Sequence, residues 1–262
     1  MKITFLGTCS GTEPMPNMHQ TSFVIEIGNA YYWFDAGEGC GYTAYTHGID
    51  VTRVRALFIS HVHIDHVGGL PHLIFTMNKV EGRYGLSHIN DGNIDVFIPN
   101  PKTLEAALYL ANDGRLNHGN EKHSGVNMIA HRVCDGVAYE DENVKITALH
   151  STHIKGDGEN GEWNAFSYLI EADGKRVIYS GDVGSPTDFD ALIGDGCDLL
   201  IMENGHHKIS DVLDYMQERK IKKLLFNHHG REMIADRAAA KQKITERGLN
   251  ADICYDGMIQ SL

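Results

Sequence analysis

Short apolar runs separated by polar, glycine-containing segments recur through the first half of the chain. Runs of about five apolar residues are typical of buried strands, and apolar residues spaced three or four positions apart indicate helices. This pattern predicts strands at residues 2–6, 21–27, 31–35, 54–60 and 93–98, and helices at residues 40–47, 65–77 and 101–111. The second and third strands should form a hairpin around Gly28-Asn29. Surface loops are predicted at residues 80–93 and 112–124, which are polar and contain glycine.

The second half of the chain shows the same two patterns of apolar residues. The pattern predicts strands at residues 144–149, 165–171, 176–179, 198–202 and 223–227, and helices at residues 210–219 and 232–247. Ser210 is an expected N-cap, and Gly248 marks the end of the last helix. Two strand-rich halves, each with its own helices, predict an α/β fold in which two β-sheets pack face to face between helical layers, a four-layer αβ/βα sandwich. A chain of 262 residues can form this as one domain over residues 1–262.

The net charge of −12 narrows the possible partners. A general nucleic-acid binder needs a basic surface to displace counterions, so this charge argues against one. The five cysteines are odd in number and include no Cys-x-x-Cys, which suits a reducing compartment. The sequence shows no signal peptide and no apolar run long enough to span a membrane. We therefore expect a cytoplasmic protein without membrane association.

Histidine is the unusual component, with 16 residues, and several of them are clustered. The segment His61-Val62-His63-Ile64-Asp65-His66 follows the apolar run 56–59 directly. Imidazole nitrogens and carboxylate oxygens are the ligands that zinc and similar divalent metals prefer. A loop at the end of a strand can direct all four of these side chains inward, and Gly68-Gly69 lets the backbone turn close to them. This segment predicts a metalloenzyme.

Three further places in the second half offer ligand-type residues immediately after an apolar strand, where loop-borne sites gather. His153 follows the strand at 144–149, with His150 as its competitor. Asp182 follows the strand that ends at Tyr179, although an aspartate after glycine is also an ordinary turn former. The third place is the pair His228-His229 after the last strand, of which one is expected to face the site.

These segments resemble the metallo-β-lactamase superfamily and, within it, the ribonuclease Z-like and related phosphodiesterase branch. The resemblance extends over most of the chain, and the histidine loop with the glycines and proline after it is its most specific element. The matching segments are Phe-Leu-Gly-Thr-Cys-Ser-Gly at 5–11, Phe-Asp-Ala-Gly-Glu-Gly at 34–39, the loop at 59–71, Tyr-Ser-Gly-Asp at 179–182 and Leu-Leu-Phe-Asn-His at 224–228.

The resemblance implies the metallo-β-lactamase fold and a site for two divalent metal ions. Zinc is the first expectation, and manganese, iron or nickel also suit these ligands. The implied ligands are His61, His63 and His153 for one metal, Asp65, His66 and His228 for the other, and Asp182 as the bridge. Asp35 would be a carboxylate behind the ligands that orients the metal loop.

Two departures from ribonuclease Z bear on the substrate. Residues 154–181 contain no basic, Gly/Pro-rich arm for gripping RNA, and the His-Glu-Ala-Thr element of that branch has no clear copy. The segment 203–207 lies in the corresponding region, so His207, or else His206, is the candidate proton donor. Asp65 and His207 are thus the candidate catalytic residues. We expect a small anionic substrate rather than extended nucleic acid, and we leave a homodimer open.

A two-metal site can supply a hydroxide at neutral pH. The function predicted is therefore hydrolysis of a phosphodiester by this hydroxide, on a small nucleotide-like substrate or an RNA end. The first alternative is a lactone or thioester hydrolase, which would use the same metals on a carbonyl carbon. The second alternative, from another class, is a binding protein that keeps the fold without turnover.

Overall fold

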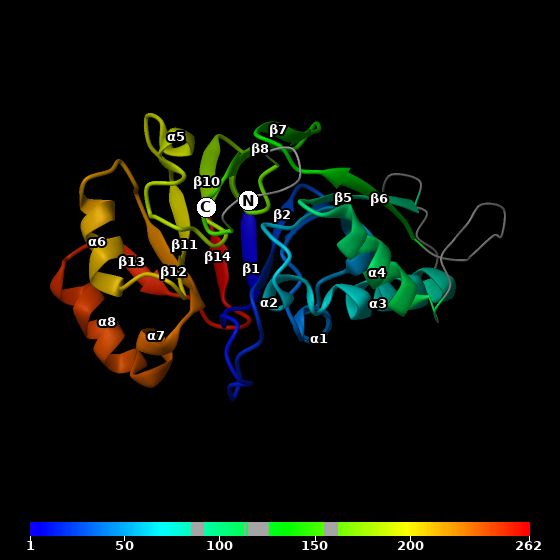
Figure 1. The fold of residues 1–262 in the computed structure, drawn as a ribbon, viewed down its shortest axis with the longest axis horizontal. Helices are drawn as coiled ribbons and strands as arrows, with labels where there is room; N and C mark the ends of the chain where they lie inside the picture. Colours follow the sequence, from blue (N-terminus) through cyan, green and yellow to red (C-terminus); the bar gives the residue numbers. More distant parts are fainter. Residues whose placement is uncertain (85–91, 113, 115–125, 155–161) are drawn as a thin grey trace.

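The computed structural model describes residues 1–84, 92–112, 114, 126–154 and 162–262. Within these residues it contains two mixed β-sheets of seven strands each. The first sheet has the order β14-β1-β2-β3-β4-β5-β6, and the second has the order β13-β12-β11-β10-β9-β8-β7. Figure 1 shows the helices of each half on the outer sides of the two sheets.

The strands of the first sheet are β1 (Lys2–Gly7), β2 (Ser22–Ile27), β3 (Ala30–Phe34), β4 (Val54–Phe58), β5 (Asn93–Ile98), β6 (Asn127–Arg132) and β14 (Ile259–Ser261). The strands of the second are β7 (Gly136–Glu140), β8 (Lys145–His150), β9 (Phe166–Ala172), β10 (Lys175–Tyr179), β11 (Leu199–Asn204), β12 (Leu224–His229) and β13 (Ala251–Ile253). β2 and β3 pair antiparallel around Gly28-Asn29, which confirms the predicted hairpin.

The helices are α1 (Cys40–Thr46), α2 (Ile64–Val67), α3 (Leu70–Tyr84), α4 (Pro101–Ala111), α5 (Asp190–Ile193), α6 (Ile209–Gln217), α7 (Arg231–Ala235) and α8 (Arg237–Glu246), with a 3-10 turn η1 (Val51–Arg53) before β4. None of the helices in the described part of the chain is long and apolar enough to cross a membrane.

Three buried apolar clusters hold the layers together. The central one lies between the two sheets and contains a stack of Phe34 on Phe58, with ring centroids 5.1 Å apart, against Tyr168 of the second sheet. A second cluster joins the first sheet to α1, α3 and α4. A third joins the second sheet to α5, α6, α7 and α8. Each sheet therefore buries one face against the other sheet and one against helices, which confirms the predicted four-layer sandwich.

Two predicted helices are each divided in the structure. The helix expected at 65–77 is α2 followed by α3, because Gly69 N donates a hydrogen bond to Ala36 O at 2.8 Å and not to the preceding turn of the helix. A Cβ at Gly69 would lie 2.2 Å from the carbonyl oxygen of Gly37, so only glycine permits this approach. α3 continues to Tyr84, so the loop expected at 80–93 begins later, and residues 85–91 lie outside the described part. The helix expected at 232–247 is interrupted at Asp236, whose side chain accepts a hydrogen bond from Ala239 N and caps α8.

The prediction missed four strands and one short helix. β6 and β7 lie at the ends of the two sheets and are largely exposed, so they lack the apolar pattern of a core strand. β13, β14 and α5 have only three or four residues each. Most of the loop expected at 112–124 lies outside the described residues.

The topology gathers the ends of several strands at one edge. β10, β11 and β12 are parallel, so their carboxyl ends meet there. The loop after β4 reaches the same edge from the first sheet, because Phe166 N donates a hydrogen bond to Ser60 O and His61 forms a bridge with Ala165. The segments in which we predicted ligands are therefore brought together.

Candidate metal centre

Four of the seven predicted ligands come from the loop after β4. His61 and His63 precede α2, and Asp65 and His66 lie within it. His66 and His61 are completely buried, and Asp65 is nearly so. Gly68 and Gly69 follow at once, and α3 then begins, so this short segment packs its ligand side chains inward.

The other three predicted ligands come from the second sheet. His153 follows β8, Asp182 follows β10 and His228 lies near the end of β12. His228 has a left-handed backbone, with φ of 50°, and its side chain faces Asp182, whereas that of His229 faces the carbonyl oxygen of Cys254. Its ring packs on Gly205, where a Cβ would lie 2.5 Å from Nδ1. A glycine at this position makes room for the His228 ring.

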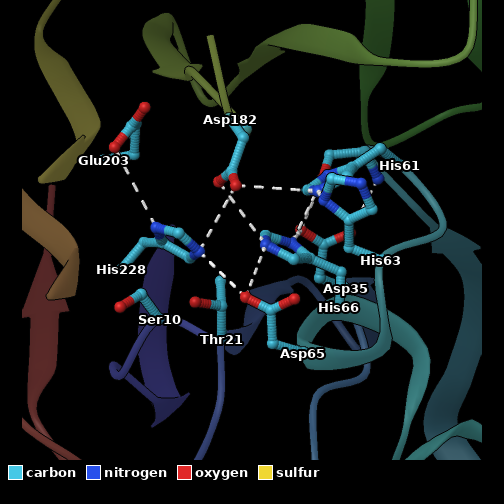
Figure 2. Close-up of polar contacts among 12 residues, drawn as sticks. Ser10, Thr21, Asp35, His61, His63, Asp65, His66, Asp182, Glu203 and His228 are labelled. Atoms are coloured by element: carbon cyan, nitrogen blue, oxygen red, sulfur yellow. Dashed lines mark hydrogen bonds and ion pairs between the residues drawn. The ribbon is translucent and has the colours of Figure 1, made fainter. Parts of the chain in front are cut away.

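Asp182 lies at the centre of the cluster, as Figure 2 shows. Its Oδ2 lies 3.6 Å from His61 Nε2, 3.7 Å from His153 Nε2 and 3.4 Å from His228 Nε2. Its Oδ1 lies 3.4 Å from His66 Nε2. One carboxylate thus faces ligand atoms of both predicted metal positions.

The remaining contacts include those expected within each predicted group, although His61 and His66 also form a cluster with Asp182. His63 Nδ1 lies 3.0 Å from His61 Nε2 and 3.3 Å from His153 Nε2. Asp65 Oδ2 lies 3.1 Å from His228 Nε2 and 3.6 Å from His66 Nε2. In each group the three candidate ligand atoms lie within 4.8 Å of one another.

The electrostatics of the cluster suit a cation. Burial opposes the charged form of Asp182, but the neighbouring His228 and His66 outweigh it and hold its pKa well below the usual range. Burial also opposes ionisation of Asp65, yet the hydrogen bond with His228 and the charge of His66 lower its pKa to about 2. Burial lowers the pKa of His66, but the Asp182 and Asp35 carboxylates outweigh it and raise this pKa well above the ordinary value. The site therefore concentrates negative charge around buried imidazoles.

Two buried atoms at the centre lack a hydrogen-bond partner among the described residues: His66 Nε2 and Asp182 Oδ1. Buried polar atoms are normally hydrogen-bonded, so an orphaned pair of ligand-type atoms indicates a missing partner. Imidazole nitrogens and carboxylate oxygens at these separations fit divalent metal ions. The residues present therefore fit the implied metals.

Asp35 holds the loop after β4 in place through hydrogen bonds. Its Oδ2 accepts hydrogen bonds from His66 Nδ1 at 2.7 Å, from Ser60 Oγ at 2.7 Å and from Tyr179 Oη at 2.5 Å. Its Oδ1 accepts from Ser60 N. Asp35 is fully buried. This network fixes the tautomer of His66 and points its Nε2 toward Asp182. Sequence reasoning did not identify Tyr179 or Ser60 as parts of this network.

We predict that Asp35→Asn weakens divalent-metal binding by about ten- to a hundredfold, because outer hydrogen-bond partners of a ligand histidine have effects of this size. The measurement is a titration with a metal-sensitive competing chelator. Asp141→Asn is the matched control. Asp141 accepts hydrogen bonds from the phenol groups of Tyr32 and Tyr139, as Asp35 does from that of Tyr179, but it lies away from the site. Both variants should unfold at lower temperature, and only Asp35→Asn should lose metal affinity. Wild-type affinity in Asp35→Asn would contradict the positioning role.

The competing histidines lie elsewhere. His150 Nδ1 donates to Asp135 Oδ2 at 2.7 Å, and its ring stacks on Trp163 with centroids 3.9 Å apart. His229 Nε2 donates to the carbonyl oxygen of Cys254. Neither belongs to the clusters of potential ligands in the described part of the chain. The placement therefore favours His153 and His228.

The two candidate proton donors, His207 and His206, lie in different surroundings. His207 Nε2 lies 3.0 Å from the carbonyl oxygen of Val183, so this nitrogen donates to backbone. His206 instead lines the pocket, whereas His207 is not among the described residues that do so. The Nδ1 of His206 donates to Glu203 Oε1 at 3.0 Å, and this hydrogen bond to a buried carboxylate raises the pKa of His206. The sequence alone left His206 and His207 as alternatives, because nothing local shows which of the two faces the pocket.

A pocket of about 310 Å³ opens over the cluster. Its lining combines residues of this cluster with the N-terminal loop and the segments after β11 and β12. The lining residues are Ser10, Gly11, Thr12, His63, Asp65, Asp182, Gly205, His206, His228, Gly230 and Arg231.

Comparison with solved structures agrees with this fold. The structure resembles YhfI of Bacillus subtilis, a metallo-β-lactamase fold protein, with a TM-score of 0.73 at 17% identity over 99% of both chains. It also resembles human tRNase Z, short form, with a TM-score of 0.69 at 18% identity over 100% of this chain and 99% of that one. In sequence, a ribonuclease Z of Archaeoglobus fulgidus is 25% identical over 87% of this chain and 86% of its own.

The fold and the clustered His/Asp residues define a hydrolase of the metallo-β-lactamase superfamily, in its ribonuclease Z-like branch. Within it, the chain belongs to the family described as Anti-Pycsar protein Apyc1, whose model matches residues 1–248.

Proposed function

We propose that this protein is a metal-dependent phosphodiesterase that acts on a small anionic substrate. The observation that carries the proposal is the convergence of four histidines on Asp182, with His63 and Asp65 beside them, at the base of a pocket that also holds His206. His61, His63 and His153 would hold one divalent ion, Asp65, His66 and His228 the other, and Asp182 would bridge them. When bound, such ions lower the pKa of a coordinated water and stabilise negative charge on oxygen.

Residues of the chain itself would orient the ligands and deliver the proton. Asp35 fixes the orientation of His66 through the Nδ1 hydrogen bond. Glu203 orients His206 and favours its protonated form, so His206 can hold a proton beside the pocket. The leaving oxygen of an ester needs a proton as its bond to phosphorus breaks, and an oriented imidazolium can deliver it. His206 thus takes the role that we first assigned to His207.

Two features favour a phosphodiester over a carbonyl substrate. The sequence relative from Archaeoglobus fulgidus is named a ribonuclease, and a ribonuclease cleaves phosphodiester bonds. A proton on His206 would also be available to an alkoxide leaving group, which needs one as the bond to phosphorus breaks. The net charge of −12 and a pocket of about 310 Å³ favour a small nucleotide-like substrate over extended RNA.

The test is a substrate comparison on protein loaded with manganese or zinc. We expect turnover of bis-p-nitrophenyl phosphate and of cyclic nucleotides, and none of lactones or thioesters. Efficient lactone or thioester hydrolysis without activity on any phosphodiester would replace the proposal with a carbonyl hydrolase on the same site. No turnover of either class by fully loaded protein would favour the binding-protein alternative.

A further inference from the structure

Arg231 and Glu13 form a two-pronged ion pair at the rim of the pocket. Arg231 Nη1 donates to Glu13 Oε1 at 2.7 Å, and Nη2 donates to Oε2 at 2.5 Å. The Arg231 side chain is 71% exposed and that of Glu13 is 55% exposed. Arg231 is the first residue of α7 and lines the pocket, and Glu13 directly follows the pocket residue Thr12. The pair therefore connects two parts of the pocket wall.

The N-terminal loop is held in place without this pair. Ser10 Oγ and Ser10 N both donate to the carbonyl oxygen of His229, at 2.8 Å and 3.2 Å, and His229 N donates to Thr8 O at 2.7 Å. Gly11 packs on the site itself, because a Cβ there would lie 3.0 Å from Asp65 Oδ2. Exposed ion pairs contribute little to stability. A structural role does not account for the pair.

The charges that line the pocket indicate that Arg231 serves to bind an anionic ligand. Arg231 is the single positively charged arginine or lysine among the described residues that line the pocket. The acidic lining residues, Asp65 and Asp182, are both proposed metal ligands. The planar guanidinium binds carboxylate and phosphate oxygens in the same fork geometry. Glu13 thus occupies the donors that a phosphate entering this pocket would use.

We propose that Arg231 binds a phosphate oxygen of the substrate and that Glu13 occupies its guanidinium until the substrate displaces it. This inference rests on the proposed function and adds a specificity-determining residue to it. The phosphate is either the one that is cleaved or a second phosphate of the same substrate. Both use the same chemistry at Arg231, and substrates with one or two phosphates separate them.

The experiment compares Arg231→Met and Glu13→Gln on the thymidine dinucleotide TpT and on its 5′-phosphorylated form pTpT. Arg231→Met should raise KM about tenfold, because it removes charged hydrogen bonds to the substrate. Glu13→Gln should lower KM several-fold, because it removes the competing carboxylate. KM is the deciding quantity in both variants, and kcat is recorded beside it so that a loss of substrate binding is separated from a loss of turnover. If KM changes for both substrates, Arg231 binds the phosphate that is cleaved. If KM changes for pTpT alone, Arg231 binds the second, 5′-phosphate.

The opposite directions of the two effects are the decisive result. Shifts in KM in the same direction, or no shift in either variant, would overturn the proposal. The matched control is the exposed pair of Arg247 with Asp214, away from the pocket lining, where Arg247→Met and Asp214→Asn should leave KM unchanged.

A binding measurement separates this inference from the proposed function. Calorimetric titration of the metal-loaded protein with inorganic phosphate should show weaker binding in Arg231→Met and tighter binding in Glu13→Gln. If the wild-type protein cleaves no phosphodiester, the proposed function fails and this titration still tests Arg231. If the wild-type protein cleaves phosphodiesters but phosphate affinity is the same in all three proteins, only the role of Arg231 fails.

Discussion

Asp182→Asn is expected to reduce phosphodiester turnover by about 10³-fold or more and to lower metal content at both positions. Asp182 is the residue whose carboxylate faces His61 and His153 on one side and His66 on the other. Replacing the carboxylate by a neutral amide would remove the negative charge that Asp182 offers to both proposed metal positions. Metal ions contribute several kcal/mol of charge stabilisation, and each 1.36 kcal/mol corresponds to about tenfold in rate.

The measurement is metal analysis by mass spectrometry on purified variants, with activity on bis-p-nitrophenyl phosphate recorded on the same preparations. Chelator-treated wild-type protein sets the level of complete loss. His153→Ala and His150→Ala form a matched pair, since the two histidines are three residues apart and only His153 faces Asp182. We expect His153→Ala to lose metal and His150→Ala to keep it. Wild-type metal content in Asp182→Asn would rule out the bridging role.

His206→Ala is expected to slow esters with poor leaving groups by about 10²- to 10⁴-fold, the range of general acid catalysis. Nitrophenyl esters should slow far less, because nitrophenolate leaves without much protonation. The physical basis is the hydrogen bond from His206 Nδ1 to the buried Glu203, which raises the pKa of His206 beside the pocket. Comparing rates for alkyl and nitrophenyl phosphodiesters therefore isolates the proton transfer from binding and metal loss.

His207→Ala is the matched control, because the Nε2 of His207 donates to the carbonyl oxygen of Val183. It should leave the ratio of rates for the two ester classes near the wild-type value. Metal content must be measured in both variants, since His206 Nδ1 lies 3.7 Å from Asp182 Oδ2. Equal slowing of both ester classes in His206→Ala would remove His206 from the acid role, and selective slowing in His207→Ala would return the role to His207.

The sequence alone determined the architecture and most of the local elements. Apolar runs identified the strands that are buried on both faces, such as β4 and β12, because burial requires continuous apolar side chains there. β6 and β7 are largely exposed, so their side chains need not be apolar and no apolar run in the sequence predicts these two strands. Helix boundaries depended on close contacts across the chain, as at Gly69 against Gly37, which no local pattern records.

In the site, the sequence determined the ligand loop at residues 61–66, because its four ligand-type residues lie within one short segment after a strand. Tertiary structure decided which member of each neighbouring pair of histidines faces the centre. His150 is held by Asp135, His229 by the carbonyl oxygen of Cys254, and His207 by that of Val183. These partners lie 15, 25 and 24 positions away in the chain. The direction of each side chain therefore depends on contacts between segments that are distant in the chain, which exist only once the strands of the second sheet have come together.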